Sequence, residues 1–144
     1  MKKILVGLDG SHASMNALKY AIKMAKNMEA EIVAVTVINE PPYKEYYADI
    51  SAKLKVEAES FFTKIREIFK GEGVNITTEI DTGVPDEILA EIAKRDKNVS
   101  MIVVGASGKG RGSRIFAGSH TVALVNQVAG GLPCAVVVVT GYND

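Results

Sequence analysis

Short aliphatic runs alternate along this chain with longer segments whose apolar residues recur at helical spacing, and this alternation limits the possible folds. Short runs rich in aliphatic and β-branched residues, bounded by turn residues, predict strands. The expected strands are residues 4–8, 32–38, 74–80, 101–104 and 135–139. The run at 74–80 alternates between apolar and polar residues, which indicates a strand with one exposed face. The other four are apolar almost throughout, as in strands buried on both faces.

Helical patterns separate the predicted strands. Ser11 or Ser14 can cap a first helix that continues through Ala25. A long helix is expected near residues 47–70, where Gly71 and Gly73 end it. A third begins at Pro85, a residue that the first helical turn tolerates. A fourth begins at Ser119 and passes through Leu124 and Val128, and the stretch 130–133 stops it.

Strands that alternate with helices in this way predict an α/β fold with a parallel sheet covered on both faces and right-handed crossovers. The chain has 144 residues and no internal repeat or linker, so residues 1–144 are expected to form a single doubly wound domain. Residues 39–47, which include two prolines and three tyrosines, are expected to form a surface loop near the carboxyl end of the sheet.

Charge and composition exclude several functions. The 17 basic and 17 acidic residues give no overall attraction for nucleic acid or an anionic membrane, so any anion site must be local. The single cysteine, Cys134, cannot form an intrachain disulfide, which fits a reducing compartment. The first apolar run is broken at Gly7 and Asp9, too early for a signal peptide, and no apolar stretch approaches the ~20 residues of a membrane helix. We therefore expect a cytoplasmic protein.

A glycine-rich segment follows the fourth predicted strand and precedes the last helix. Its glycines are Gly105, Gly108, Gly110, Gly112 and Gly118, and its cations are Lys109, Arg111 and Arg114. Glycine lets main-chain N–H groups turn toward an anion, and a helix beginning at Ser119 adds donors and a positive dipole end. A solvated surface loop is the alternative. The position between a buried strand and a helix favours an anion site, because ligands of open α/β sheets bind at the carboxyl ends of strands.

The named phosphate motifs do not fit this segment. The residues after Gly110 are Arg111 and Gly112, so the P-loop pattern fails, and the first strand lacks the dinucleotide signature. His12 and His120 are the only histidines, and neither has metal-ligand spacing. His120 is either a phosphate contact or an ordinary helix residue. No nucleophile–base pair stands out, so no catalytic residue is assigned.

Asp9 follows the first strand, where it is either a turn residue or an acceptor for adenine or ribose. We favour the ligand role because the glycine-rich segment should be its neighbour. Val37, near the end of the second strand, is expected in the core, with its backbone lining a base pocket.

The glycine spacing resembles a known family signature. Gly105-x2-Gly108-x9-Gly118-Ser119 is similar to the G-2x-G-9x-G-(S/T) motif of ATP-binding universal stress proteins. The opening stretch 4–11, the turn at 82–85 and the strand 102–105 also resemble that family, so the likeness spans nearly the whole chain.

The resemblance implies a five-stranded parallel sheet of order 3-2-1-4-5 with helices on both faces. It also implies that Asp9 and the Val37 backbone hold adenine and ribose, while the motif glycines and Ser119 hold ribose and phosphates. ATP, often with magnesium or manganese, is the implied ligand, and a homodimer through the last strand is the implied assembly. With the strand ends and loop cations, the expected nucleotide-binding residues are Gly7, Leu8, Asp9, Val37, Val104, Gly105, Gly108, Lys109, Arg111, Gly118, Ser119 and His120.

Three functions remain open on the sequence. The first is a stress-response or regulatory ATP-binding module with at most slow hydrolysis. The second is a partner-binding dimerisation module that binds AMP, cyclic AMP or no nucleotide. The third is an enzyme of the wider adenine-nucleotide α/β group, although its His-x-x-His and Ser-Gly-Gly motifs are absent.

Overall fold

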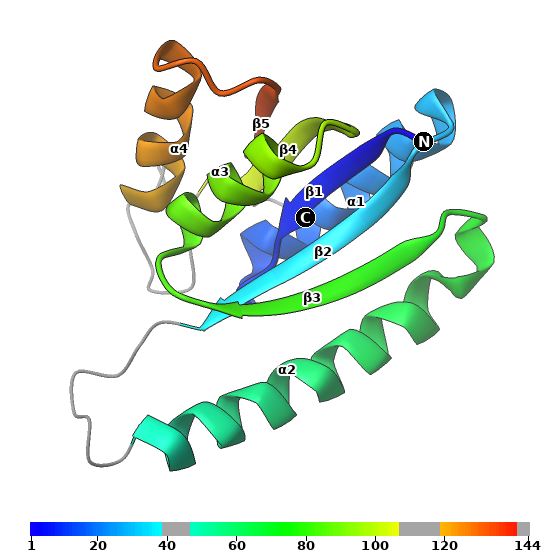
Figure 1. The fold of residues 1–144 in the computed structure, drawn as a ribbon. Coiled ribbons are helices and arrows are strands. Elements are labelled where there is room, and N and C mark those ends of the chain that lie inside the picture. The colour runs from blue at the N-terminus through cyan, green and yellow to red at the C-terminus, as the bar shows by residue number, and fades with distance from the viewer. Residues whose placement is uncertain (39–46, 107–118, 141–144) are drawn as a thin grey trace.

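The computed structural model describes residues 1–38, 47–106 and 119–140, without the side chains of residues 47–51, 119–122 and 129. Its five strands form one parallel sheet in the order β3-β2-β1-β4-β5, which confirms the predicted fold class and strand order (Figure 1). The strands are β1 (Lys3–Gly7), β2 (Glu31–Ile38), β3 (Ile76–Thr82), β4 (Val99–Gly105) and β5 (Ala135–Val139). The helices are α1 (His12–Met28), α2 (Tyr47–Phe69), α3 (Pro85–Arg95) and α4 (Ser119–Ala129), with a 3-10 turn at Lys70–Glu72.

The largest difference from the expected boundaries is in β3. The sequence pattern placed this strand at residues 74–80, whereas it runs from Ile76 to Thr82. Asp81 and Thr82 look unlike strand residues in sequence, but they pair with Val37 and Ile38 because the neighbouring strand sets the length of the ladder. The predicted loop at 39–47 lies outside the described residues, apart from Tyr47, which begins α2.

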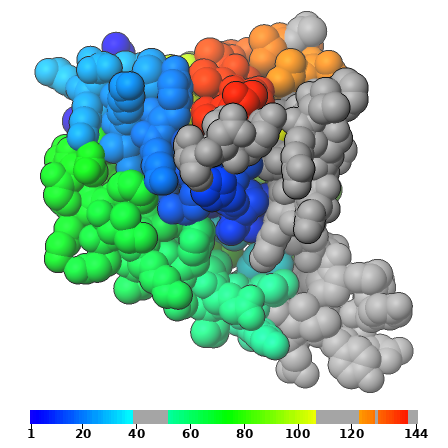
Figure 2. Space-filling view, turned by 180° about the vertical axis from the view of Figure 1, so that it is seen from behind, coloured from blue at the N-terminus to red at the C-terminus, as the bar shows by residue number. Residues whose placement is uncertain are grey.

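Helices cover both faces of the sheet. One core cluster joins α1 and α2 to the sheet through residues such as Leu18 and Phe62. The second cluster joins α3 and α4 to the opposite face through residues such as Leu89 and Leu124. Figure 2 shows α1 and α2 on the face turned away from the viewer in Figure 1. Among the described residues, no helix has both the length and the apolar character needed to span a membrane.

Local signals fix the ends of the helices. Ser11 is the N-cap of α1, and its hydroxyl accepts a hydrogen bond from the Ser14 N–H at 3.1 Å. The helix ends at Met28, and its C-cap Glu29 is a non-glycine residue in the left-handed conformation, with φ of 54°. Gly73 has the same conformation, with φ of 76°, after the 3-10 turn.

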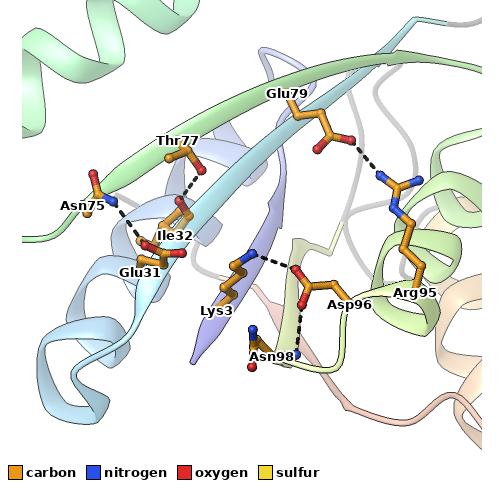
Figure 3. Close-up of polar contacts among 9 residues, drawn as sticks. All are labelled: Lys3, Glu31, Ile32, Asn75, Thr77, Glu79, Arg95, Asp96 and Asn98. Carbon is orange, nitrogen blue, oxygen red and sulfur yellow. Dashed lines mark hydrogen bonds and ion pairs between the residues drawn. The ribbon is translucent and has the colours of Figure 1, made fainter. Parts of the chain in front are cut away.

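An ion pair ties the amino end of β1 to the turn before β4. Lys3 Nζ lies 2.8 Å from Asp96 Oδ2, and the Asn98 N–H donates to Asp96 Oδ1 (Figure 3). The Lys3 hydrogen bond, and then the Asn98 N–H, hold the pKa of Asp96 below its usual value. This ion pair lies at the edge of the sheet where the strands begin.

Gly105 permits the closest approach between a helix and the sheet. A Cβ atom at this position would lie 2.7 Å from the Ala13 carbonyl carbon and 2.8 Å from its Cβ. Real Cβ atoms do not approach backbone atoms so closely, so the first turn of α1 can rest on the end of β4 only when residue 105 is glycine.

We expect Gly105→Ala to destabilise the protein by about 1–3 kcal/mol, because the added methyl group must push α1 away from β4. Urea unfolding followed by circular dichroism measures the change. Gly71→Ala is the matched control, since a Cβ there meets no atom within 4 Å. Equal stabilities for the two variants would contradict the packing role of Gly105.

Candidate functional site

The carboxyl edge of the sheet is stepped, because the central strand ends before its neighbours. The last rung between β1 and β2 is Gly7–Val35, whereas β2 stays paired with β3 to Ile38. The last rung between β1 and β4 is Val6–Val103, whereas β4 stays paired with β5 to Gly105. The strand order also reverses direction between β1 and β4. In open α/β sheets this switch point is where ligands bind.

The main chain of β2 presents Val37 to this step. The Val35 carbonyl accepts from the Leu8 N–H at 2.8 Å, so Val35 turns its main-chain groups toward β1. The Ile38 carbonyl accepts from the Gly83 N–H, on the side of β3. Because successive residues of a strand alternate between neighbours, Val37 also turns its N–H and C=O toward β1, two residues beyond Val35, the last β2 residue paired with β1. This orientation is the one that the expected base contact requires.

Asp9 lies in a tight turn between β1 and α1. Its Oδ1 accepts from the Ser11 N–H at 2.9 Å, and Gly10 between them has φ of 82°. The Asp9 N–H points to Ser14 Oγ at 3.4 Å, and the same hydroxyl donates to the Ser11 carbonyl at 3.0 Å. Asp9 is therefore the turn residue that the sequence suggested, and its exposed carboxyl group lies at the switch point.

Thr36 anchors the residue before Asp9. Its Oγ1 donates to the Leu8 carbonyl at 2.9 Å, which binds the end of β1 to β2 after the regular ladder has stopped. Sequence analysis did not identify this residue. A threonine in an otherwise aliphatic strand was the available signal, and β-branching alone explained it equally well.

Several expected site residues have packing roles. Leu8 and Val104 are buried core residues, at 2% and 8% exposure. A Cβ at Gly7 would lie 3.2 Å from Leu89 Cδ1, so this glycine makes room for α3. Gly105 makes room for α1, as described above. Nucleotide contacts from these four residues would be main-chain contacts, and they stay predictions.

The remaining expected residues belong to the glycine-rich segment and the start of α4. Gly108, Lys109, Arg111 and Gly118 lie outside the described residues. Ser119 and His120 open α4 as predicted, without described side chains. The structure therefore brings Asp9, Val37 and Gly105 to one edge of the sheet. Within the described part of the chain, no group of three or more His, Cys, Asp or Glu residues is placed to hold a metal ion.

Comparison with known proteins identifies the family. The sequence model of the Universal stress protein family matches residues 1–140. The chain belongs to the universal stress protein family. Universal stress protein MJ0531 of Methanocaldococcus jannaschii is 37% identical over 123 residues, which cover 82% of this chain and 72% of that protein. The putative universal stress protein SERP1273 of Staphylococcus epidermidis is 32% identical over 142 residues, which cover 96% of this chain and 83% of that protein.

Solved structures of universal stress proteins share the architecture. The universal stress protein UspA from Lactobacillus plantarum superposes with a TM-score of 0.81 at 28% identity, covering 96% of this chain and 97% of that one. The five-stranded parallel sheet described above is therefore a universal stress protein fold.

We expect Thr36→Val to lower the free energy of unfolding by about 1 kcal/mol, since the Leu8 carbonyl loses its side-chain donor. Thr36→Ser retains the hydroxyl and serves as the control. Chemical unfolding of both variants gives the difference. Identical stabilities for the valine and serine variants would show that the hydrogen bond does not hold the end of β1.

Proposed function

We propose that this universal stress protein binds ATP at the carboxyl edge of its sheet and acts as a stress-response or regulatory module. The observation that carries the proposal is the early end of β1. It leaves the Asp9 carboxyl group at the switch point, together with the Val37 main-chain groups that face the β1 side of β2. Asp9 supplies an acceptor for a ribose or adenine donor, and Val37 supplies a donor and an acceptor for the base edge.

The phosphates are assigned to the stretch between β4 and α4. Gly105 ends β4, and Ser119 begins α4 at the other end of the glycine signature. Main-chain N–H groups at the start of α4 and the positive end of its dipole favour an anion there. Gly108, Lys109, Arg111 and Gly118 are proposed to complete the phosphate contacts.

Other proteins with this fold are described with adenine nucleotides. One universal stress protein was solved in complex with cAMP, with a TM-score of 0.72 at 20% identity. An Arabidopsis thaliana family member was solved with AMP bound, with a TM-score of 0.64 at 16% identity. At these identities the likeness shows the fold alone, so the proposal of ATP depends on the glycine signature of this chain.

The proposal includes no catalytic residue. No general base or arginine finger is assigned from the sequence, so we expect ATP turnover to be slow at most. Calorimetric titration with ATP, ADP, AMP and cyclic AMP tests the ligand class, together with mass spectrometry of the nucleotide that co-purifies. Rapid product formation would instead favour an enzyme, and the absence of any binding would favour a partner-binding module.

We expect Asp9→Ala to weaken ATP binding about tenfold, which corresponds to about 1.4 kcal/mol for one lost hydrogen bond to a charged acceptor. Calorimetry gives the affinity, and urea unfolding confirms that the variant is folded. Glu67→Ala is the control, because Glu67 is a solvent-exposed carboxylate of α2 that forms a surface ion pair with Lys70. Unchanged affinity in folded Asp9→Ala would remove Asp9 from the site.

We also propose a homodimer through β5. This strand is an edge of the sheet, and Val136 to Val139 are only partly buried in the single chain. The Val139 carbonyl accepts from the Ala106 N–H, so the odd-numbered residues of β5 bond to β4 and the even-numbered residues turn their N–H groups outward. An unpaired apolar edge of this kind favours pairing with a second strand.

We expect Val138→Pro to convert the dimer into a folded monomer, because proline removes an outward N–H and leaves the bonds to β4 in place. Size-exclusion chromatography with light scattering measures the assembly. Val138→Thr preserves the N–H and is the matched control. A Val138→Pro variant that stays dimeric would place the interface elsewhere.

A further inference from the structure

Two carboxyl groups lie next to each other on the edge strand β3. Glu79 and Asp81 are two residues apart in the strand, so their side chains point to the same face of the sheet. Their partners on β2 are Val35 and Val37, which pack in the core cluster beneath α3 and α4. The carboxyl pair is thus on the α3 side of the sheet, beside aliphatic neighbours that can offer neither charge nor hydrogen bonds.

Neither carboxyl group is well solvated. Asp81 Oδ2 is buried and has no hydrogen-bond partner in the described part of the chain. The Glu79 side chain is 34% exposed and lies on the same face of β3 as the Asp81 carboxylate. Two like charges in this position are unfavourable, and a single proton between them removes the repulsion and satisfies the buried oxygen.

One cation approaches the pair from the helix layer. Arg95 of α3 reaches Glu79 with Nη2 to Oε2 at 3.4 Å, as Figure 3 shows, and its side chain is largely exposed. On the opposite face of β3, Arg66 of α2 hydrogen-bonds Thr78 instead. Among the described residues, the charged groups acting on Glu79 are therefore Asp81 and Arg95. The hydrogen bond to Asp81, then desolvation and the Asp81 charge, raise the pKa of Glu79 to about 7, against the opposing effect of Arg95.

The carboxyl pair lies on the part of β3 that pairs with the end of β2, so local opening of β3 would affect the region around Val37. Among the described strands, β3 is at the edge of the sheet and pairs with β2. Asp81 is the ladder partner of Val37, and the Gly83 N–H donates to the Ile38 carbonyl just beyond. Edge strands with one neighbour open locally more easily than central strands.

We propose that Glu79 and Asp81 share one proton and form a pH-sensitive fastener that secures the carboxyl half of β3 to the sheet. With the proton in place, the two side chains hydrogen-bond and β3 stays closed beside Val37. When the proton leaves, two adjacent carboxylates repel each other on an edge strand, and the end of β3 opens more often. The proton goes to solvent or buffer, and no bond to carbon changes.

The sign of the pH dependence follows from proton binding. The folded state holds a proton that the unfolded chain, with an ordinary glutamate pKa, releases at lower pH. The contribution of Glu79 to stability is therefore fully present below about pH 4.5 and is lost as pH rises to about 7. Because Glu79 is about one-third exposed, water reduces the effect. We expect the folding equilibrium constant of the wild type, relative to Glu79→Gln, to fall on the order of tenfold between pH 5 and pH 8.

The central experiment compares unfolding from pH 5 to pH 8 in three proteins. Glu79→Gln keeps a permanent donor to Asp81, so it should lose the wild type's fall in stability. Glu57→Gln removes an exposed carboxyl group on α2 and should follow the wild type. Parallel pH profiles for wild type and Glu79→Gln would overturn the proposal.

Carboxyl-carbon NMR measures the titration midpoint of Glu79 directly, and a purely structural role of Glu79 would leave this midpoint at the ordinary glutamate value. The Glu79 signal should titrate with a midpoint near pH 7 in the wild type, fall toward the ordinary glutamate value in Asp81→Asn, and rise in Arg95→Gln. Hydrogen exchange at β3, corrected for intrinsic rates, should show more opening at pH 8 than at pH 6 in the wild type only. A wild-type midpoint near 4.3, or pH-independent opening, would overturn the fastener.

A second consequence rests on the proposed function. Since β3 supports Val37, ATP affinity should decline from pH 6 to pH 8 in the wild type more than in Glu79→Gln. The unfolding, NMR and exchange measurements use no nucleotide. If the chain does not bind ATP, the unfolding, NMR and exchange results still test the carboxyl pair. If the carboxyl pair has no effect on β3, the proposed ATP site still stands.

Discussion

The whole structure depends on a central parallel strand that must be covered on both faces. β1 has Ile4, Leu5 and Val6 fully buried, with alternate side chains in the two core clusters. Water is excluded from both sides only when helices cover both sides, so α1 and α2 on one face and α3 and α4 on the other follow from one aliphatic run. The same strand is short, and its early end creates the stepped edge at which Asp9 and Val37 meet.

Much of this architecture could be predicted from the sequence, because aliphatic runs and helical stripes carry a strong signal. The buried strands, the Ser11 cap of α1 and the start of α3 at Pro85 are local features, and the structure confirms them. The end of β3 is different. Asp81 and Thr82 belong to the strand because β2 extends beside them, and no local pattern records the length of a neighbouring strand.

The candidate site was predicted less completely than the fold. Proximity of the strand ends follows from parallel topology, so the convergence of Asp9, Val37 and Gly105 could be expected. The hydrogen bond from Thr36 could not be expected, because its acceptor is the Leu8 carbonyl, 28 residues away in the sequence. Glu79 was missed for a similar reason. Its environment is set by Asp81 two positions on and by Arg95 from another helix, and a single acidic residue in a strand pattern looks like part of a solvated face.

Gly105 has a consequence for how its family's signature should be interpreted. The glycine needed by the signature is also required by the contact between α1 and β4, where any side chain would collide with Ala13. Selection for a stable fold would therefore preserve glycine at position 105 even in a protein that no longer binds a nucleotide. The first glycine of the signature is therefore weak evidence for nucleotide binding, because the packing of α1 on β4 would preserve it even after binding was lost.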